Sequence, residues 1–423
     1  MTQKLEINKK ILIISHNAMN ASSNCGRTIM EMFCSCESEN LAQLFLHKDT
    51  PNSNICTNYY SVTDFDIRDS LIKFKKPGKR VQLNEAGATK EEEVRYGEGS
   101  KRKSHMVFMR NLAWGFNTWF TKDLKKWLNE FNPDIIFFMG GCYVFSHKLA
   151  LKISRYLKKP MITFWGDDYY LNNALKNGIL GGINNSYFKY IMRKTIRLSE
   201  YICLDEMMEK DYSIAFKKAG HCIYTSSSMK PFADKLSNER ITMSFLGNIS
   251  IQRYKSLKEI ASIIQKEKLQ IDLNVYTGEK RAWILENIIG VNGLNYKGAV
   301  DYCQVLEIMG NSDILVHVED FSESSINEVK YSFSTKIADS LCSNRCLFAY
   351  GPASVASIKY LIDNKCAIVA TNSEELEENL KNIVSNRKIM SEFASRGLQV
   401  ASSNHNSEIN WGKIVSIVEK VSK

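Results

Sequence analysis

Short apolar runs separated by stretches of helical length recur through most of this 423-residue chain. Each run is too short for a buried helix and ends in small or polar residues, which is typical of a strand buried on both faces. Strands that alternate with helices predict parallel sheets covered by helices on both faces. The segments that we expect to be strands with their terminal loops are Lys9–Asn17, Pro133–Gly141, Pro160–Asp168, Tyr201–Leu204, Met243–Asn248, Ile271–Tyr276, Asp313–Val318, Cys346–Tyr350 and Ala367–Ala370.

The alternation breaks once, between Ser226 and Arg240, and then starts again. A chain of 423 residues is too long for one ordinary core, and two domains of roughly 200 residues each are the natural expectation. We therefore predict an α/β fold with two Rossmann-like, doubly wound domains, residues 1–235 and 236–404, and a cleft between them. Residues 405–423 carry apolar side chains at helical spacing and predict a C-terminal amphipathic helix.

Composition excludes several classes of protein. Hydrophobic residues make up 44% and charged residues 24%, which is ordinary for a globular protein. The longest apolar run, residues 135–145, falls short of the roughly 20 residues that span a bilayer. The start has no signal-peptide pattern, so we expect a cytoplasmic protein. The 11 cysteines include no Cys-x-x-Cys pair, and we expect no metal site.

The formal charge of +10 is concentrated in residues 73–80 and 101–103. Such a surface can attract nucleic acid, anionic lipid or a phosphorylated substrate, or it can be a solvated loop without a partner. No nucleic-acid motif accompanies the charge, so we expect no nucleic acid. Residues 66–105 predict a charged surface insertion. Residues 114–128 carry aromatic side chains at helical spacing, a pattern typical of core packing and, less often, of membrane contact.

The polar turn Ser334-Thr335-Lys336 predicts a phosphate-binding site. It follows the apolar run Ile314–Val318 and leads into a short helical stretch and a second apolar run, Cys346–Tyr350. Strand, turn, helix and strand form a βαβ unit. Such a turn aims backbone N–H groups and one ammonium at the start of the helix, where anions bind.

In open parallel sheets, ligands bind outside the carboxyl ends of the strands. The polar residues that follow the expected strands are therefore the candidates. In the first domain we place on the acceptor side Asn17, Arg27, Gly140, Gly141, Asp167 and Asp168. In the second domain the candidates are Gly247, Asn248, Arg253, Lys255, Tyr276, Gly298, Glu319, Ser334, Thr335, Lys336 and Asp339.

Three segments of the second half resemble the glycosyltransferases of the GT-B fold, above all the retaining family 4 enzymes (glycosyl transferases group 1). They are Phe245–Asn248 with the downstream basic residues Arg253 and Lys255, then Lys297–Val300, and then Ser334–Arg345. The likeness covers most of residues 243–370, whereas the first half is similar only in outline. It implies the GT-B fold, with the C-terminal helix packed back on the N-terminal domain.

The resemblance also implies roles. Arg253 and Lys255 would grip the donor diphosphate, and residues 334–336 would add further donors to it. Asp339 stands where the family usually has a glutamate that binds the ribose hydroxyls. Glu319 is the match for the acid that faces the donor sugar.

Two departures from the family pattern leave alternatives open. The usual Glu-x7-Glu spacing is absent, because Glu319 and Asp339 lie twenty positions apart. The first-domain loop that often carries a histidine here reads Trp165-Gly166-Asp167-Asp168. Asp167 and Asp168 can instead cap the following helix, and the basic residues can be plain surface charges. Which acid faces the sugar stays open.

The resemblance implies a retaining glycosyltransferase that uses a nucleotide-diphosphate sugar, a UDP-sugar above all, and a saccharide or lipid-linked acceptor. We expect a role in cell-surface polysaccharide biosynthesis, with peripheral membrane contact. Lysine and arginine can neutralise the departing diphosphate, so we expect no cofactor or metal to be required. The alternatives are a nucleotide-sugar epimerase and a catalytically weak GT-B scaffold that binds membrane or a partner.

Overall fold

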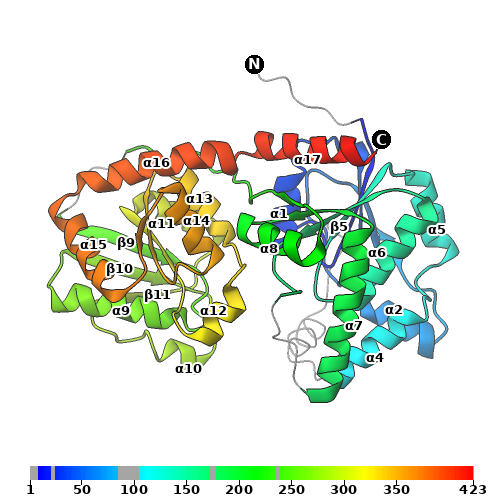
Figure 1. The fold of residues 1–423 in the computed structure, drawn as a ribbon, viewed down its shortest axis with the longest axis horizontal. Helices are drawn as coiled ribbons and strands as arrows, with labels where there is room; N and C mark the ends of the chain where they lie inside the picture. Colours follow the sequence, from blue (N-terminus) through cyan, green and yellow to red (C-terminus); the bar gives the residue numbers. More distant parts are fainter. Residues whose placement is uncertain (1–7, 21–23, 84–103, 172–177, 235–238, 423) are drawn as a thin grey trace. The chain divides into compact units, whose positions relative to one another are not determined.

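The computed structural model describes residues 8–20, 24–83, 104–171, 178–234 and 239–422 (Figure 1). The chain divides into two compact units. Unit 1 comprises Met1–Thr225 and Ser407–Lys423, and unit 2 comprises Ser226–Asn406. Each unit contains one mainly parallel sheet with helices packed on it, which confirms the predicted α/β class.

The sheet of unit 1 has neighbouring strands that run parallel, apart from one antiparallel pair at its edge. Its central strands are buried along their whole length, which explains why they read as continuous apolar runs. The strands lie in the order β4 (Lys79–Val81), β3 (Asn58–Ser61), β2 (Leu41–Phe45), β1 (Ile11–Ser15), β5 (Ile135–Met139), β6 (Met161–Trp165), β7 (Glu200–Cys203) and β8 (His221–Cys222).

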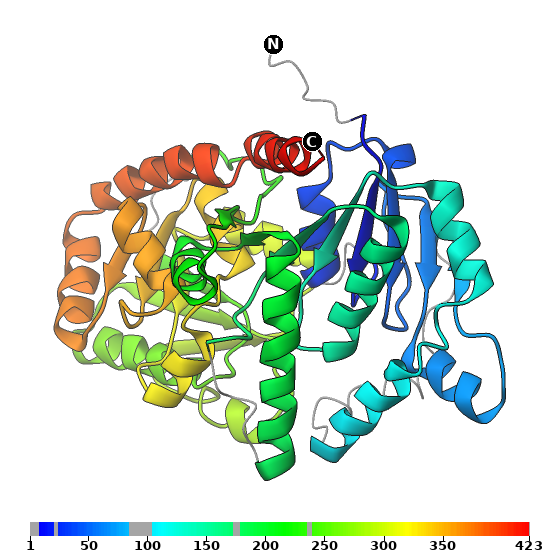
Figure 2. The ribbon, with the colours of Figure 1, turned by 45° about the vertical axis from the view of Figure 1, so that its right-hand side comes forward.

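Helices cover this sheet with apolar side chains. The core between sheet and helices includes Leu12, Ile136, Trp127 and Leu149, all at most 1% exposed. Two of the helices, α4 and α7, pack side by side (Figure 2). The described helices of the unit are α1 (Asn24–Met32), the short η1 (Ser38–Asn40), α2 (Asp64–Ile72), α4 (Ser104–Gly115), α5 (Lys122–Phe131), α6 (Val144–Leu157), α7 (Gly178–Arg197), α8 (Glu206–Phe216) and α17 (Ser407–Val421).

The C-terminal helix α17 belongs to unit 1. Trp411 is buried with its ring centroid 6.0 Å from that of Phe33, and Asn410 Nδ2 donates to the Tyr224 carbonyl at 3.0 Å. The units divide at Thr225/Ser226 and not at the expected residue 235. The reason is that Ser227 already belongs to unit 2, where its N–H donates to the His405 carbonyl at 3.0 Å.

The predicted insertion at residues 66–105 is wrong in its first part. Residues 66–72 lie in α2, which begins with a capping box between Thr63 and Asp66, and residues 79–81 form the antiparallel strand β4. Residues 84–103 lie outside the described residues. The aromatic stretch 114–128 spans two helices, because Thr121 caps α5 by accepting from the Leu124 N–H at 3.1 Å.

The sheet of unit 2 is parallel throughout, so all its carboxyl ends lie at one edge. Its order is β11 (Leu294–Gly298), β10 (Ile271–Tyr276), β9 (Ile241–Leu246), β12 (Ile314–Val318), β13 (Cys346–Tyr350) and β14 (Ile368–Ala370). Its described helices are α9 (Arg253–Lys266), α10 (Ala282–Leu285), α11 (Tyr302–Asn311), α12 (Glu323–Val329), α13 (Thr335–Cys342), α14 (Ala356–Asn364), α15 (Ser373–Ser385) and α16 (Lys388–Asn404).

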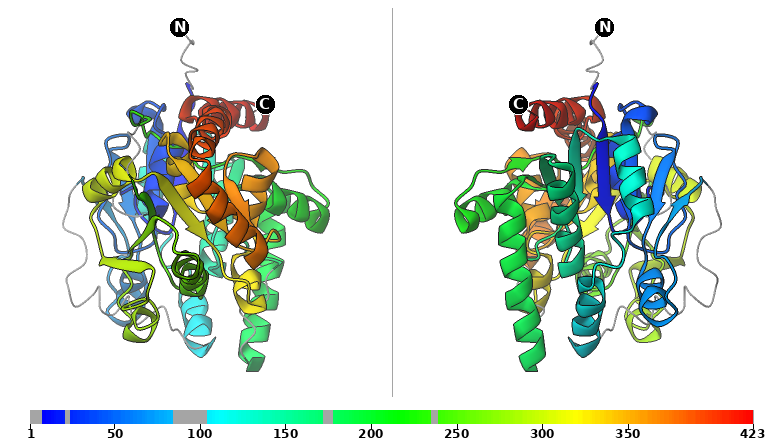
Figure 3. Two further views of the ribbon diagram at one scale, coloured as in Figure 1. Left: turned by 90° about the vertical axis from the view of Figure 1, so that its left-hand side faces the viewer. Right: turned by 90° about the vertical axis from the view of Figure 1, so that its right-hand side faces the viewer.

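The crossover from β12 to β13 holds one more helix than expected. The seven-residue α12 lies between β12 and the turn that starts α13. The turn Ser334-Thr335-Lys336 therefore does not follow β12 directly. Helix α16 packs along α13 in this unit (Figures 1 and 3). Within the described parts of the chain, no helix has the length and apolar character needed to cross a membrane.

Candidate functional site

The carboxyl ends of β9, β10 and β11 are joined by backbone hydrogen bonds. The Gly247 N–H donates to the Tyr276 carbonyl at 3.0 Å, and the Thr277 N–H donates to the Gly298 carbonyl at 2.9 Å. Gly298 has a φ of +82° and no atom within 4 Å of where a Cβ would stand. A φ in this range favours glycine. This edge therefore has open backbone that a ligand can approach closely.

Lys336 reaches the same edge from the first turn of α13. A Cβ on Gly247 would lie 3.9 Å from the Lys336 Nζ, and Lys336 is exposed. The structure thus brings together the end of β9 and the ammonium that the sequence placed in a phosphate-binding turn. An exposed ammonium in the first turn of a helix, at the carboxyl ends of parallel strands, is an arrangement that favours an anion.

Arg253, the first residue of α9, forms a bidentate ion pair with Glu319, which follows β12. Arg253 Nε and Nη2 donate to Glu319 Oε2 and Oε1, both at 2.8 Å. The Glu319 side chain is 2% exposed and that of Arg253 is 18% exposed. Burial raises the pKa of the Glu319 carboxyl, and the charge of Arg253 opposes that rise. The resemblance implied separate roles for these two residues, and the structure joins them.

The backbone of Glu319 is fixed from three sides. Its N–H donates to the Tyr350 carbonyl at 3.0 Å, and its carbonyl accepts from Ser256 Oγ at 2.8 Å. A Cβ on Gly351 would lie only 3.0 Å from the Glu319 Cβ. The carboxylate that holds Arg253 is consequently rigid, and so is the position of the guanidinium.

His317, on β12, lies beside Glu319. Its Nε2 lies 3.1 Å from Ser357 Oγ and 3.6 Å from Glu319 Oε1. Burial lowers its pKa to about 3, and the charges of Arg253 and Lys336 add to that effect. His317 is therefore neutral at physiological pH. Glu319, which holds Arg253, follows the end of the same strand.

The loop between β9 and α9 is tied to α12. Gln252 Nε2 donates to Ser322 Oγ at 3.0 Å and to Ser325 Oγ at 3.2 Å, while Gln252 Oε1 accepts from the exposed Lys255 ammonium. Ile251 and Gln252 both have positive φ, at 57° and 59°, which is unusual for side chains of this size. These contacts fix the loop that presents Arg253.

Other predicted donor-site residues have defined local partners. The Asp339 carboxylate accepts from Ser227 Oγ at 2.6 Å, so it secures the first residues of unit 2. Asn248 Oδ1 accepts from the Ser250 N–H at 2.7 Å and shapes the loop after β9. Ser334 is the N-cap residue of α13 but makes no side-chain cap bond, and the helix begins at Thr335.

In unit 1, two predicted acceptor-side residues make local contacts. The Asn17 carbonyl accepts from Ser15 Oγ at 2.7 Å and from Gln43 Nε2 at 3.1 Å. Arg27 Nε donates to Glu31 Oε1 at 2.8 Å, one helical turn away. These contacts set the conformation of the loop after β1 and of helix α1.

The loops after β5 and β6 are packed tightly. A Cβ on Gly140 would lie 2.7 Å from the ring of Trp165, whereas a Cβ on Gly141 would meet nothing within 4 Å. Asp168 Oδ1 accepts from the N–H groups of residues 170 and 171 and from the hydroxyl of Tyr212. Asp168 therefore holds a loop in shape. Its neighbour Asp167 is exposed in the same loop.

Sequence reasoning missed Asp205, which follows β7 and caps α8. Its Oδ1 accepts from the Met208 N–H at 2.8 Å, while Oδ2 has no partner among the described residues. Burial raises the pKa of this carboxyl to about 7. An acidic residue just before a helix was a visible cap signal, but its burial depends on long-range packing.

Among the described residues, no three or more His, Cys, Asp or Glu side chains gather in a way that could hold a metal ion. The candidate site is thus built from two cations, one buried carboxylate, a neutral histidine and open glycine backbone. Such a set can bind an anion and stabilise negative charge that grows on it.

The amino-acid sequence matches no protein-family model and no curated protein sequence. Solved structures similar to this chain include HepE of Anabaena in complex with UDP, at 10% identity and a TM-score of 0.62 over 97% of this chain and 100% of that chain. WaaG, a glycosyltransferase involved in lipopolysaccharide biosynthesis, has 12% identity and a TM-score of 0.57 over 96% and 99%. Sucrose-phosphate synthase from Thermosynechococcus elongatus has 10% identity and a TM-score of 0.62 over 97% of this chain and 99% of that chain. The likeness shows the fold, which is GT-B.

Proposed function

We propose that this protein is a glycosyltransferase that takes its sugar from a nucleotide-diphosphate sugar, with UDP as the nucleotide. The observation that carries the proposal is that Lys336 lies beside Gly247 at the end of β9, and that Glu319 holds Arg253 at the end of the neighbouring strand β12. The similar HepE structures contain UDP and UDP-glucose, which supports a uridine nucleotide. We further propose a saccharide or lipid-linked acceptor and a role in cell-surface polysaccharide synthesis, in line with what WaaG is described as doing.

The chemistry of the donor explains the residue types. When the glycosidic bond breaks, negative charge grows on the departing diphosphate, and cations placed there bind the transition state better than the ground state. A guanidinium has five N–H donors. Glu319 accepts one N–H of Arg253 from Nε and one from Nη2, so three N–H groups of the guanidinium remain for a phosphate. Lys336 supplies an ammonium to the same group.

With cations in this role, we propose that the reaction requires no metal and no further cofactor. We also propose that it proceeds with retention of configuration. The acceptor hydroxyl then attacks from the face that the diphosphate leaves, and its proton passes to the departing phosphate oxygen. We propose that the protein works in the cytoplasm, at the inner face of the membrane.

The test is calorimetric titration of the whole protein with UDP, GDP and ADP, followed by turnover with the matching sugar nucleotides. We expect UDP to bind, and we expect Lys336→Ala to lower turnover by about 10²–10³-fold, the scale for losing one donor to the transition state. We expect Lys255→Ala to act in the same direction.

Lys258→Ala is the matched control, because Lys258 is an exposed lysine on the same helix as Arg253. It should leave both binding and turnover unchanged. UDP binding without turnover of any sugar nucleotide would favour the scaffold alternative. Wild-type rates in both Lys255→Ala and Lys336→Ala would show that the phosphate site lies elsewhere.

A further inference from the structure

The loop between α2 and β4 presents a bare aromatic ring to solvent. Phe74 is 91% exposed and has a φ of +55°, a backbone conformation that bulky side chains rarely adopt. Both features are unfavourable in water, because the apolar ring stays hydrated and the backbone is strained. A partner that covers the ring would offset both.

The loop is held in this shape at both ends. The N–H groups of Lys73 and Lys75 donate to the Asp69 carbonyl at 2.9 and 3.3 Å. At the other end Gly78 has a φ of +82°, and a Cβ there would lie 2.8 Å from the ring of Tyr60. The loop therefore closes tightly against β3, and the outward position of Phe74 is a fixed feature of the fold.

Further exposed apolar side chains lie next to this loop. Ile72, the last residue of α2, is 69% exposed, and Phe116, just beyond α4, is 62% exposed. The two segments are tied by a 2.8 Å hydrogen bond between Ser70 Oγ and Thr118 Oγ1. Helices α2 and α4 also pack on each other (Figure 2). We call Ile72, Phe74 and Phe116 the apolar tip.

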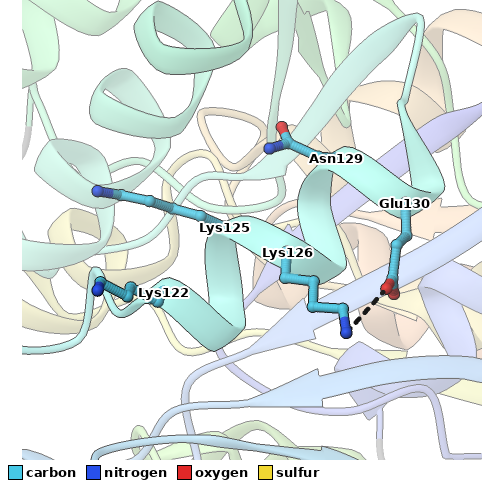
Figure 4. Close-up of a pocket in the computed structure, with 5 residues that line it drawn as sticks. All are labelled: Lys122, Lys125, Lys126, Asn129 and Glu130. Atoms are coloured by element: carbon cyan, nitrogen blue, oxygen red, sulfur yellow. Dashed lines mark ion pairs between the residues drawn. The ribbon is translucent and has the colours of Figure 1, made fainter.

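Cations surround the apolar tip. Residues 73–80 contain five lysines and arginines and no acid. The Lys76 ammonium lies 3.7 Å from Asp123 in the first turn of α5, which places the loop beside that helix. On α5, Lys122 and Lys125 extend to one side while Lys126 turns toward Glu130 (Figure 4). The basic side chains outnumber their acidic partners.

We propose that the apolar tip docks unit 1 on an anionic lipid bilayer. Phe74 and Ile72 would enter the headgroup region, and the lysines beside them would face lipid phosphates. Exposed apolar side chains flanked by cations suit an anionic interface, where binding strength grows with buried apolar area and with electrostatic attraction. A different protein would need an acidic patch to match these cations. A second copy of this chain would be repelled, because its own loop is equally basic. This inference rests on the membrane location proposed above, whereas its test does not depend on glycosyl transfer.

The test is co-sedimentation of the whole protein with vesicles of equimolar phosphatidylglycerol and phosphatidylcholine, and with phosphatidylcholine alone. We expect binding to the anionic vesicles that weakens as salt is added. Phe74→Ser should reduce affinity by about 10- to 100-fold, the range for withdrawing one large apolar side chain. Lys75→Ala and Lys76→Ala should each reduce it by about fivefold.

Two matched controls separate docking from general effects. Ile72→Ser should weaken binding, whereas Ile214→Ser on α8, where the side chain is 68% exposed, should not. Lys388→Ala removes an exposed charge in unit 2 and should leave binding unchanged. Equal binding to neutral and anionic vesicles would overturn the proposal, and so would equal losses of vesicle affinity in Ile72→Ser and Ile214→Ser. Dimers that depend on Phe74 and form without vesicle binding would overturn it as well.

Discussion

The buried carboxyl of Asp205 makes a sharp prediction about stability and pH. Asp205 is 2% exposed, and its Oδ2 has no partner among the described residues. Burial is the main cause of its raised pKa, and the charges of Asp211 and Glu206 add to it. We therefore expect Asp205→Asn to stabilise the protein at alkaline pH. Asparagine keeps the cap, because its carbonyl can accept from the Met208 N–H as Oδ1 does now.

The size and sign of the effect follow from the two pKa values. The carboxyl titrates near 3.8 in its ordinary state and at about 7 in the fold, so the folded protein binds this proton more tightly than the unfolded chain. Stability then falls as pH rises from about 4 to about 7, and the full loss persists above that. About three pH units at 1.36 kcal/mol each give a limit of about 4 kcal/mol.

The assay is urea unfolding of the whole protein, followed by the fluorescence of its tryptophans, at several pH values from 4 to 8.5, which span the window of about 4 to 7 in which Asp205 titrates. We expect the gain from Asp205→Asn to be small at the acid end and to grow toward the limit at the alkaline end. Asp301→Asn is the matched control, since Asp301 caps α11 in the same way but is exposed. A gain that does not change with pH, or one that Asp301→Asn reproduces, would refute the reasoning.

Two further substitutions test the packing of the sites. Arg253→Ala leaves a buried, unpaired Glu319 carboxylate and should cost about 3–5 kcal/mol in unfolding free energy, measured by urea unfolding. Adding Glu319→Gln to this variant should restore part of the lost stability. Losses that simply add in the double variant would contradict the pairing. Gly140→Ala puts a methyl group 2.7 Å from the buried ring of Trp165 and should cost about 1–3 kcal/mol. Gly141→Ala has open space and serves as its control, so equal losses in melting measurements would count against the clash.

Strands buried on both faces were visible in the sequence, and strands at the edges were not. β5 and β13 read as continuous apolar runs because helices cover both faces of the sheet. β3 and β4 are short and partly polar, and β4 pairs antiparallel at the sheet edge. Local periodicity carries little signal for such strands, so the segment around β4 read as a surface insertion.

The candidate site could likewise be predicted only in part from the sequence. The residue types and the loops that carry them could be predicted, because ligands bind at the carboxyl ends of parallel strands. The pairing of Arg253 with Glu319 could not, since 66 positions separate them in the chain. The raised pKa of Asp205 was equally hidden, because it depends on burial by segments distant in the sequence.

The Arg253–Glu319 pair bears on which group does what at the proposed donor site. Both carboxylate oxygens of Glu319 accept from Arg253, and the backbone of Glu319 is fixed by Ser256 and Tyr350. We infer that Glu319 acts by positioning the guanidinium. A cation fixed in this way needs no reorganisation when charge develops on a departing diphosphate, and that is the condition under which electrostatic stabilisation is largest. Lys336, which is exposed, then adds a second positive charge at the same site.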